Sequence, residues 1–236
     1  MVKSYLTNAD GSLKSVVDAV EHDGSGPHER QEKPHMHFAG FTPDEKYVIA
    51  IDLGSDSLTT YAVNHGELTK VQTFKTKPGS GPRHIAFHPD GKHAYVMTEL
   101  TSEVIVLEYH AEDGYFTEKQ YIKAIPTDYK EVNDGSAIHI TKDGKFVYVA
   151  NRGHNSIAAY EVDNVTNELT FIEWQSTKGD WPRDFVLDPT DQYLVASNQK
   201  SGTLTLFRRD EKTGKLTVIQ EGVVAPEVVC VKFLNQ

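Results

Sequence analysis

Apolar and polar residues alternate with a period of two through most of this chain. The clearest runs are "LTTYAV" (58–63), "VIVLEY" (104–109), "IAAYEV" (157–162) and "LTLFRR" (204–209). Between such runs stand short groups rich in Gly, Asp, Asn and Ser, which favour turns. No segment has a convincing helical periodicity. The pattern therefore predicts a series of short β-strands joined by tight turns.

The strands recur as a repeat. The segments "FTPDEKYV", "FHPDGKHAYV", "ITKDGKFVYV" and "LDPTDQYLV" align on Asp44, Asp90, Asp143 and Thr190, which are 46, 53 and 47 residues apart. The longest interval contains the extra loop "IPTDYKEVND". Each unit continues through a polar step, an alternating run, a second turn and a fourth alternating segment.

Four strands in a unit of about 47 residues is the pattern of a β-propeller blade. The fold class is therefore expected to be all-β, a propeller, with residues 1–236 as one domain. A β-sandwich with evenly spaced strands is the alternative. The segment 2–20 aligns with the third and fourth strands of a unit, and 225–234 aligns with a first strand. We expect four complete four-stranded blades and two partial ones, with amino-terminal blades missing.

The first two strands of each unit should form an antiparallel hairpin, so residues on either side of its turn meet at one edge of the sheet. In a propeller the first strand lies innermost, and this edge surrounds the mouth of the central channel. The positions that the repeat places there are His37, Arg83, Ser136 and Arg183 before the turns, and Leu53, Glu99, Arg152 and Gln199 after them.

Three arginines at equivalent positions predict a concave anion site, because guanidinium groups bind carboxylate or phosphate in a bidentate manner. We therefore expect a small acidic substrate. His35 lies two residues before His37 and should share its strand face by alternation, and His84 follows Arg83 directly. These histidines are candidates for acid–base chemistry.

Composition narrows the possible partners. Of 236 residues, 24 are Lys or Arg and 34 are Asp or Glu, and the formal net charge of −10 argues against a nucleic-acid partner. The single cysteine, Cys230, excludes an internal disulfide and favours a reducing compartment such as the cytoplasm. We expect Cys230 to pack in a strand. No apolar run approaches the roughly 20 residues that cross a bilayer, and no signal peptide is evident, so no membrane partner is expected.

Other chemistry is less well supported. The pair in "HMH" (35–37) lacks a local third ligand of the kind that catalytic zinc sites use, so no metal is expected. The two "GSGP" segments lack the Lys-Ser/Thr of a phosphate-binding loop and are interpreted as turns. We expect no cofactor. The short "ERQE" segment (29–32) is expected to shape the channel mouth.

Four motifs resemble a known family: "GSGPHERQEKPHMH" (24–37), "GSGPRHIAFHPDGKHAYVMTEL" (79–100), "SAIHITKDGKFVYVANRGHNSI" (136–157) and "WPRDFVLDPTDQYLVASN" (181–198). They resemble the lactonase family of seven-bladed propellers, which includes bacterial 6-phosphogluconolactonases and the fungal 3-carboxy-cis,cis-muconate lactonizing enzymes. The resemblance covers essentially the whole chain. It implies that about two amino-terminal blades are missing.

The resemblance also implies an activity and a site. The activity is hydrolysis of a sugar lactone, 6-phospho-D-glucono-1,5-lactone, in the pentose phosphate pathway. The implied catalytic residues are His35, Arg83, Glu99 and Arg152, and Arg183 also matches a family motif. We expect Arg183 to bind substrate together with His37, His84 and Gln199, which the repeat places near the channel mouth. Either Glu99 or His35 could be the base, with the other as the acid.

Three alternatives remain open at this point. The chain could catalyse lactone formation like the fungal relatives, or it could be a non-catalytic propeller that binds a partner on one face. Arg83 and Arg183 could serve only to bond backbone carbonyls between blades, and Glu99 could only neutralise an arginine. The oligomeric state is not predicted.

Overall fold

The computed structural model describes residues 1–234, and these form an all-β protein with a single turn of 3-10 helix, η1 (Glu29–Gln31). Four sheets have four strands each, and a fifth has two. The two-stranded sheet is β1 (Val2–Thr7) and β2 (Leu13–Val20). The other strands are β3 (Met36–Phe41), β4 (Tyr47–Asp52), β5 (Ser57–Asn64), β6 (Glu67–Lys75), β7 (Pro82–Phe87), β8 (His93–Thr98), β9 (Glu103–His110), β10 (Tyr115–Lys123), β11 (Asp134–Ile140), β12 (Phe146–Arg152), β13 (Ser156–Val162), β14 (Leu169–Ser176), β15 (Pro182–Leu187), β16 (Tyr193–Asn198), β17 (Thr203–Arg209) and β18 (Leu216–Val224).

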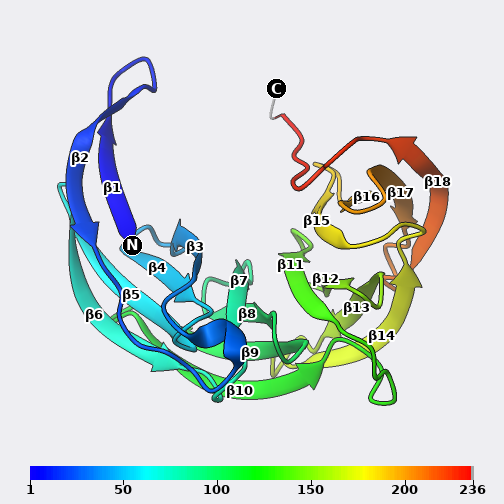
Figure 1. Ribbon diagram of the computed structural model, residues 1–236, viewed down its shortest axis with the longest axis horizontal. Helices are drawn as coiled ribbons and strands as arrows, with labels where there is room; N and C mark the ends of the chain where they lie inside the picture. The colour runs from blue at the N-terminus through cyan, green and yellow to red at the C-terminus, as the bar shows by residue number, and fades with distance from the viewer. Residues whose placement is uncertain (235–236) are drawn as a thin grey trace.

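Each four-stranded sheet is an antiparallel meander in which strands pair in chain order. The sheets succeed one another around an arc, with the first strands β3, β7, β11 and β15 innermost and the fourth strands outermost (Figure 1). Each first strand contacts the first strand of the next sheet along the inner side of the arc. This radial arrangement confirms the propeller-type fold expected from the repeat, and the sandwich alternative is wrong.

Apolar layers between neighbouring sheets hold the arc together. The third and fourth sheets, for example, enclose Tyr148, Phe185 and Phe207, none of which is exposed to solvent. Similar layers join the first sheet to the second and the second to the third. Burial of one such side chain contributes about 1.5–3 kcal/mol, so these layers fix the distance and angle between sheets. The inner edges of the sheets are positioned as a consequence.

Every first strand carries a β-bulge near its start. The ladder slips between Met36 and Phe38, between Pro82 and His84, and between Pro182 and Asp184, and β11 slips between Gly135 and Ile138. The extra residues are His37, Arg83 and Arg183, with Ser136 in the equivalent part of β11. A bulge re-aims the side chain at the point where it occurs. Strict alternation therefore fails here, and the expectation that His35 and His37 share a strand face does not apply.

The two ends of the described chain behave differently. The pairing of β1 with β2 confirms an antiparallel pair in 2–20. Residues 225–234 form no strand, so the expected first strand there is wrong; they find no ladder partner among the described residues, and Val231 N donates instead to Asp184 Oδ2 (3.1 Å). Cys230 is exposed rather than packed in a strand.

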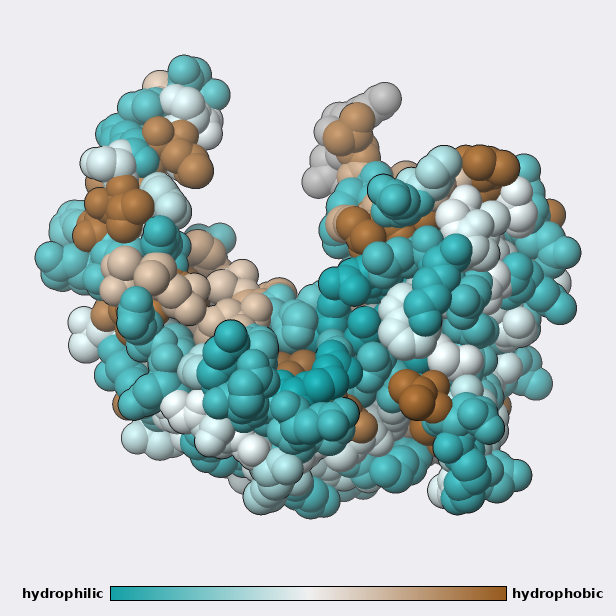
Figure 2. Space-filling view, viewed as in Figure 1, coloured by the Kyte–Doolittle hydropathy of each residue, from teal (hydrophilic) through white to brown (hydrophobic). Residues whose placement is uncertain are grey.

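The arc stays open between β1 and the residues after β18 (Figure 1). Figure 2 shows apolar residues on the arm that carries β1, β2 and β3, whereas polar residues cover most of the floor of the arc. This arm includes a hollow of about 400 Å³ lined by Val2, Leu6, Phe41, Val48 and Leu68, among others. Within residues 1–234, no helix is long and apolar enough to cross a membrane.

Side-chain oxygens of one sheet accept hydrogen bonds from backbone N–H groups that precede the next sheet. Asp56, in the turn before β5, accepts hydrogen bonds from Gly79 N and Gly81 N, both at 2.7 Å. Asn155 in the third sheet accepts in the same way from Trp181 N (2.9 Å). Asp56 and Asn155 have left-handed backbones, with φ of 50° and 53°. These side chains fix the approach to β7 and β15, which carry Arg83 and Arg183.

We predict that Asp56→Ala destabilises the fold by about 1–3 kcal/mol, because the Gly79 and Gly81 amides lose a buried acceptor. Urea unfolding of the whole chain measures this change. Asp163→Ala is the matched control, since Asp163 also accepts from two backbone amides but is exposed. Water can replace its carboxylate. Equal losses in the two variants would contradict the proposed role of the Asp56 tie.

Candidate active site

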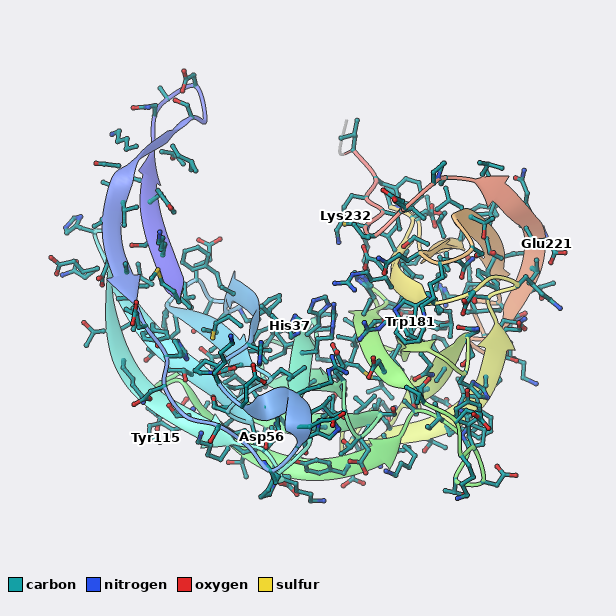
Figure 3. The ribbon with its side chains drawn as sticks, viewed as in Figure 1. His37, Asp56, Tyr115, Trp181, Glu221 and Lys232 are labelled. Carbon is teal, nitrogen blue, oxygen red and sulfur yellow. The ribbon has the colours of Figure 1, made fainter. Side chains whose placement is uncertain are left out.

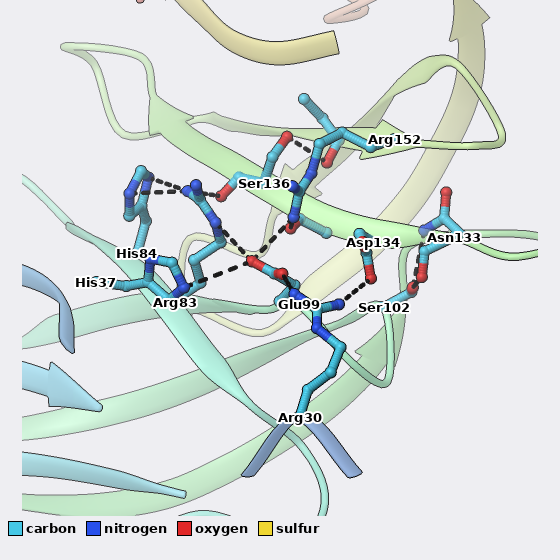
Figure 4. A network of polar contacts seen from close by, with 12 residues as sticks. Arg30, His37, Arg83, His84, Glu99, Ser102, Asn133, Asp134, Ser136 and Arg152 are labelled. Carbon is cyan, nitrogen blue, oxygen red and sulfur yellow. Dashed lines mark hydrogen bonds and ion pairs between the residues drawn. The ribbon is translucent and has the colours of Figure 1, made fainter. Parts of the chain in front are cut away.

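The centre of the candidate site is a buried carboxylate. Glu99 follows β8 directly, is 2% exposed, and its backbone N donates to Gly81 O (2.7 Å) at the start of the hairpin. Oε2 of Glu99 accepts from Arg83 Nε (2.8 Å) and lies 2.9 Å from Arg152 Nη2, while Oε1 accepts from Arg30 (Figure 4). Burial opposes ionisation of Glu99, but Arg152, Arg83 and Arg30 together hold the pKa of its carboxyl below the usual value.

Arg83 and Arg152 also bond the backbone of β11. Arg83 Nη1 donates to Ser136 O (3.2 Å) and Arg152 Nη2 to Gly135 O (2.9 Å), and each residue is 4% exposed. Burial lowers the pKa of Arg83 to about 10 against the opposing effect of Glu99, and burial also lowers that of Arg152. Both remain cations at neutral pH. The Arg83 bond joins the second sheet to the third, whereas the Arg152 bond lies within the third sheet.

Arg30 is a member of this cluster that the motif reading missed. It lies in η1, where His28 caps the turn by accepting from Arg30 N. Its guanidinium spans from Glu99 to Asp134 Oδ1, the latter at 2.9 Å, and closes the carboxylate from the solvent side. Only the basic residue in "ERQE" hinted at this role. The partners lie 69 and 104 residues away, beyond the reach of any local pattern.

Two histidines stand beside the cluster. His37 Nε2 lies 3.9 Å from Glu99 Oε2. Burial, followed by the charge of Arg83, lowers the pKa of His37 to about 4 even though Glu99 acts in the opposite direction. The ring of His84 lies 2.9 Å from Arg83 Nη1 through its Nε2, and burial together with Arg83 lowers its pKa to about 3. Both imidazoles are therefore neutral at pH 7.

The structure separates His35 from the carboxylate. His35 Nε2 pairs with Glu32 Oε1 at 3.1 Å, and the backbone of His35 anchors the hairpin by accepting from Leu53 N (3.0 Å). His35 and His37 both line a hollow of about 280 Å³ together with Arg30. Only His37 among these two histidines lies beside Glu99.

Arg183 and Gln199 stand further round the mouth. Arg183 lies in the bulge of β15, and its charge contributes to the lowered pKa values of His37 and Arg83. Gln199 N donates to Trp181 O (3.0 Å), which places Gln199 after β16 at the expected hairpin end. Leu53, Glu99 and Gln199 thus all bond back to the start of their first strand, as the hairpin register implied.

The inner strands also enclose a cavity of about 460 Å³. It lies between β7, β11 and β15 and the segment that follows β18, and its lining includes Arg83, His84, His139, Arg183 and Lys232. Burial lowers the pKa of His139 to about 4. This volume suits a small molecule.

The arrangement suits an anionic ester or lactone. Over residues 1–234, no group of three or more His, Cys, Asp and Glu side chains is placed to hold an ion. Instead, one carboxylate is outnumbered by Arg30, Arg83, Arg152 and Arg183, and the local charge is positive in a chain whose net charge is −10. Fixed guanidinium groups can stabilise a developing oxyanion, and a neutral imidazole can accept a proton.

Relatives of known sequence and structure align with most or all of this chain. It is 58% identical over 235 residues to a Bacillus subtilis protein named 6-phosphogluconolactonase, covering 100% of this chain and 67% of that protein. A crystal structure of a Lactobacillus plantarum protein superposes with a TM-score of 0.96 at 41% identity, over 99% of this chain and 68% of the other. A Pseudomonas aeruginosa periplasmic gluconolactonase gives 0.89 at 32% identity, over 94% and 63%.

The family model described as "Lactonase, 7-bladed beta-propeller" matches residues 1–233. This match covers the four sheets, η1 and every residue of the Glu99 cluster. The chain therefore belongs to the seven-bladed β-propeller lactonase family.

Proposed function

We propose that the protein hydrolyses a sugar lactone, with 6-phospho-D-glucono-1,5-lactone as substrate and 6-phosphogluconate as product. The observation that carries this proposal is a neutral histidine, His37, beside a buried carboxylate that is bonded to three arginines. The 58% identical relative named for this activity supports the choice of substrate. The excess of guanidinium groups suits a phosphorylated substrate.

His37 is the better base in this geometry. The Glu99 oxygens already accept from Arg30, Arg83 and Arg152, so the carboxylate has little capacity left to take a proton from water. In the proposed reaction, His37 takes a proton from water as the water oxygen attacks the lactone carbonyl carbon. The ring C–O bond then breaks, and the imidazolium returns the proton to the leaving ring oxygen. The product acid ionises in solution.

The arginines act on charge. Arg83 and Arg152 are held in place by Glu99 and by carbonyl groups of β11, so they need no rearrangement when the carbonyl oxygen becomes negative. Arg183 has no ion pair among the described residues and is available to bind an anionic part of the substrate. Glu99 serves in this proposal as the group that orients the cations. His84, bonded to Arg83, keeps that guanidinium aligned.

The wider architecture is also a proposal. The four-stranded sheets and the β1–β2 pair are parts of a seven-bladed ring, in which residues 1–236 belong to a single propeller domain with four complete blades and one partial blade formed by β1 and β2. The family description and the 67% share of the Bacillus subtilis protein support this. A cytoplasmic location stays a prediction, because a family relative at 32% identity is described as periplasmic.

The first prediction separates the two histidines. His37→Gln should lower kcat by about 10²–10⁴, the usual contribution of a general base. His35→Gln should leave kcat nearly unchanged, since His35 pairs with Glu32 and not with Glu99. Acid release from freshly prepared 6-phosphogluconolactone, corrected for spontaneous hydrolysis, measures both. A large loss in His35→Gln with an active His37→Gln would reverse the assignment.

The second prediction concerns pH. Because burial and Arg83 lower the pKa of His37 to about 4, its ring should stay neutral and able to accept a proton from pH 7.5 down to about 5.5. An imidazole of ordinary pKa, near 6.5, would be mostly protonated at the lower value. NMR of the imidazole nitrogens, with the His37 signal identified by its loss in His37→Gln, tests this. A titration midpoint above 6 would contradict it.

The third prediction concerns the carboxylate. Glu99→Gln removes the charge shared by Arg30, Arg83 and Arg152 and should destabilise the fold by about 3–5 kcal/mol, as for other buried pairs that lose one partner. Activity should fall with it. Glu103→Gln is the control, since Glu103 pairs with Lys123 near the surface (3.2 Å). Urea unfolding that finds Glu99→Gln as stable as its control would refute the central role of this carboxylate.

A further inference from the structure

Trp181 has a backbone conformation that bulky residues rarely adopt. It stands immediately before β15 with φ of +65°, in the left-handed region. Gly81 holds the equivalent place before β7 with φ of +60°. The two positions make matching bonds: their N–H groups donate to Asn155 and Asp56, and their carbonyl groups accept from Gln199 N and Glu99 N. The fold therefore requires this conformation, and glycine satisfies it without strain.

A tryptophan at such a position is unfavourable for folding, and strain of this kind gathers at ligand-binding sites. The position of the indole agrees with such a use. Its ring centroid lies 5.5 Å from Arg152 Cζ, and Arg152 is bonded to Glu99. Trp181 is half-buried and stands at the mouth on the opposite side of β7 and β11 from His37 (Figure 3). The same indole ring thus lies near Arg152 of the Glu99 cluster and near a second rim residue.

That residue is Lys200. Its Nζ lies 3.3 Å from the Trp181 ring centroid, while its backbone N donates to Asp180 O (3.1 Å). Lys200 is exposed and forms no ion pair within residues 1–234. A cation over an exposed aromatic face is only weakly bound, so an anion arriving at the mouth can attract the ammonium group away from the ring. The Lys200 ammonium therefore lies beside the site, and no carboxylate of residues 1–234 pairs with it.

We propose that Trp181 and Lys200 form a subsite that recognises the phosphate end of the substrate and selects phosphorylated over unphosphorylated sugar lactones. The indole face packs against the sugar ring, and the Lys200 ammonium pairs with the phosphate oxygens. The lactone carbonyl then lies toward Arg83, Arg152 and His37. This inference rests on the proposed function.

The test compares two substrates, 6-phosphoglucono-1,5-lactone and glucono-1,5-lactone, each corrected for spontaneous hydrolysis. Lys200→Ala should lower kcat/KM for the phosphorylated lactone by about tenfold, the effect expected from one lost charge-assisted contact. It should leave kcat/KM for the other lactone nearly unchanged. Lys77→Ala is the matched control, because Lys77 Nζ also lies over an aromatic ring, that of Tyr121 at 3.6 Å, in a different part of the molecule.

Trp181→Gly extends the test. Glycine fits the left-handed backbone, so the variant should fold. Both lactones should lose the contact of the sugar ring with the indole, and the phosphorylated lactone should lose more, because the indole no longer holds the Lys200 ammonium in place. Lys200→Arg should keep the selectivity. If Lys200→Ala leaves the ratio of the two kcat/KM values unchanged, whether by no loss or by an equal loss on both lactones, the subsite is overturned.

Failure of the proposed function gives a different result. In that case the parent protein shows no rate above spontaneous hydrolysis with either lactone. Calorimetric binding of 6-phosphogluconate and of gluconate, which need no turnover, still tests the subsite. The subsite predicts tighter binding of 6-phosphogluconate to the parent protein and loss of this preference in Lys200→Ala. Equal affinity of the parent protein for both acids overturns it.

Discussion

The Glu99 carboxylate is the constraint on which the inner face of this protein depends. A charge that is 2% exposed is tolerated only if it is paired and hydrogen-bonded. Its partners come from three places: Arg30 from η1, Arg83 from the second sheet and Arg152 from the third. The carboxylate can be satisfied only when these elements are correctly placed relative to one another. Folding of the arc and assembly of the site are therefore one requirement.

The same pairing leaves an excess of positive charge. One carboxylate cannot neutralise three guanidinium groups, and Asp134 takes up only part of the charge of Arg30. Arg152 Nε is buried without a hydrogen-bond partner among the described residues. Arg183 and Lys200 add further cations at the mouth. In an acidic chain this local excess attracts anions to one place. Burial, together with this positive charge, lowers the pKa of His37 and of His84 and keeps both rings neutral.

The sequence predicted the repeat, the hairpins and the positions at their inner ends, because turn residues and alternation are local signals. It placed Arg83, Glu99 and Arg152 at one edge, and the structure brings these three into contact. It could not predict the bulges, since one extra residue in a ladder leaves no distinct local pattern. Alternation therefore placed His35 and His37 on one strand face, and the family resemblance assigned the catalytic role to His35, whereas the bulge directs His37 to Glu99. Arg30 was missed because its contacts are distant in sequence.

The repeat supplies equivalent backbone positions, and the site arises from how their residues differ. The bulges carry His37, Arg83, Ser136 and Arg183. Ser136 is the small member: its Oγ donates to Pro182 O (2.8 Å), and its own carbonyl accepts from Arg83. An arginine at position 136 would fill the space that the Arg83 guanidinium occupies and would add repulsion. A serine at this one position lets arginines of neighbouring sheets meet at a single carboxylate.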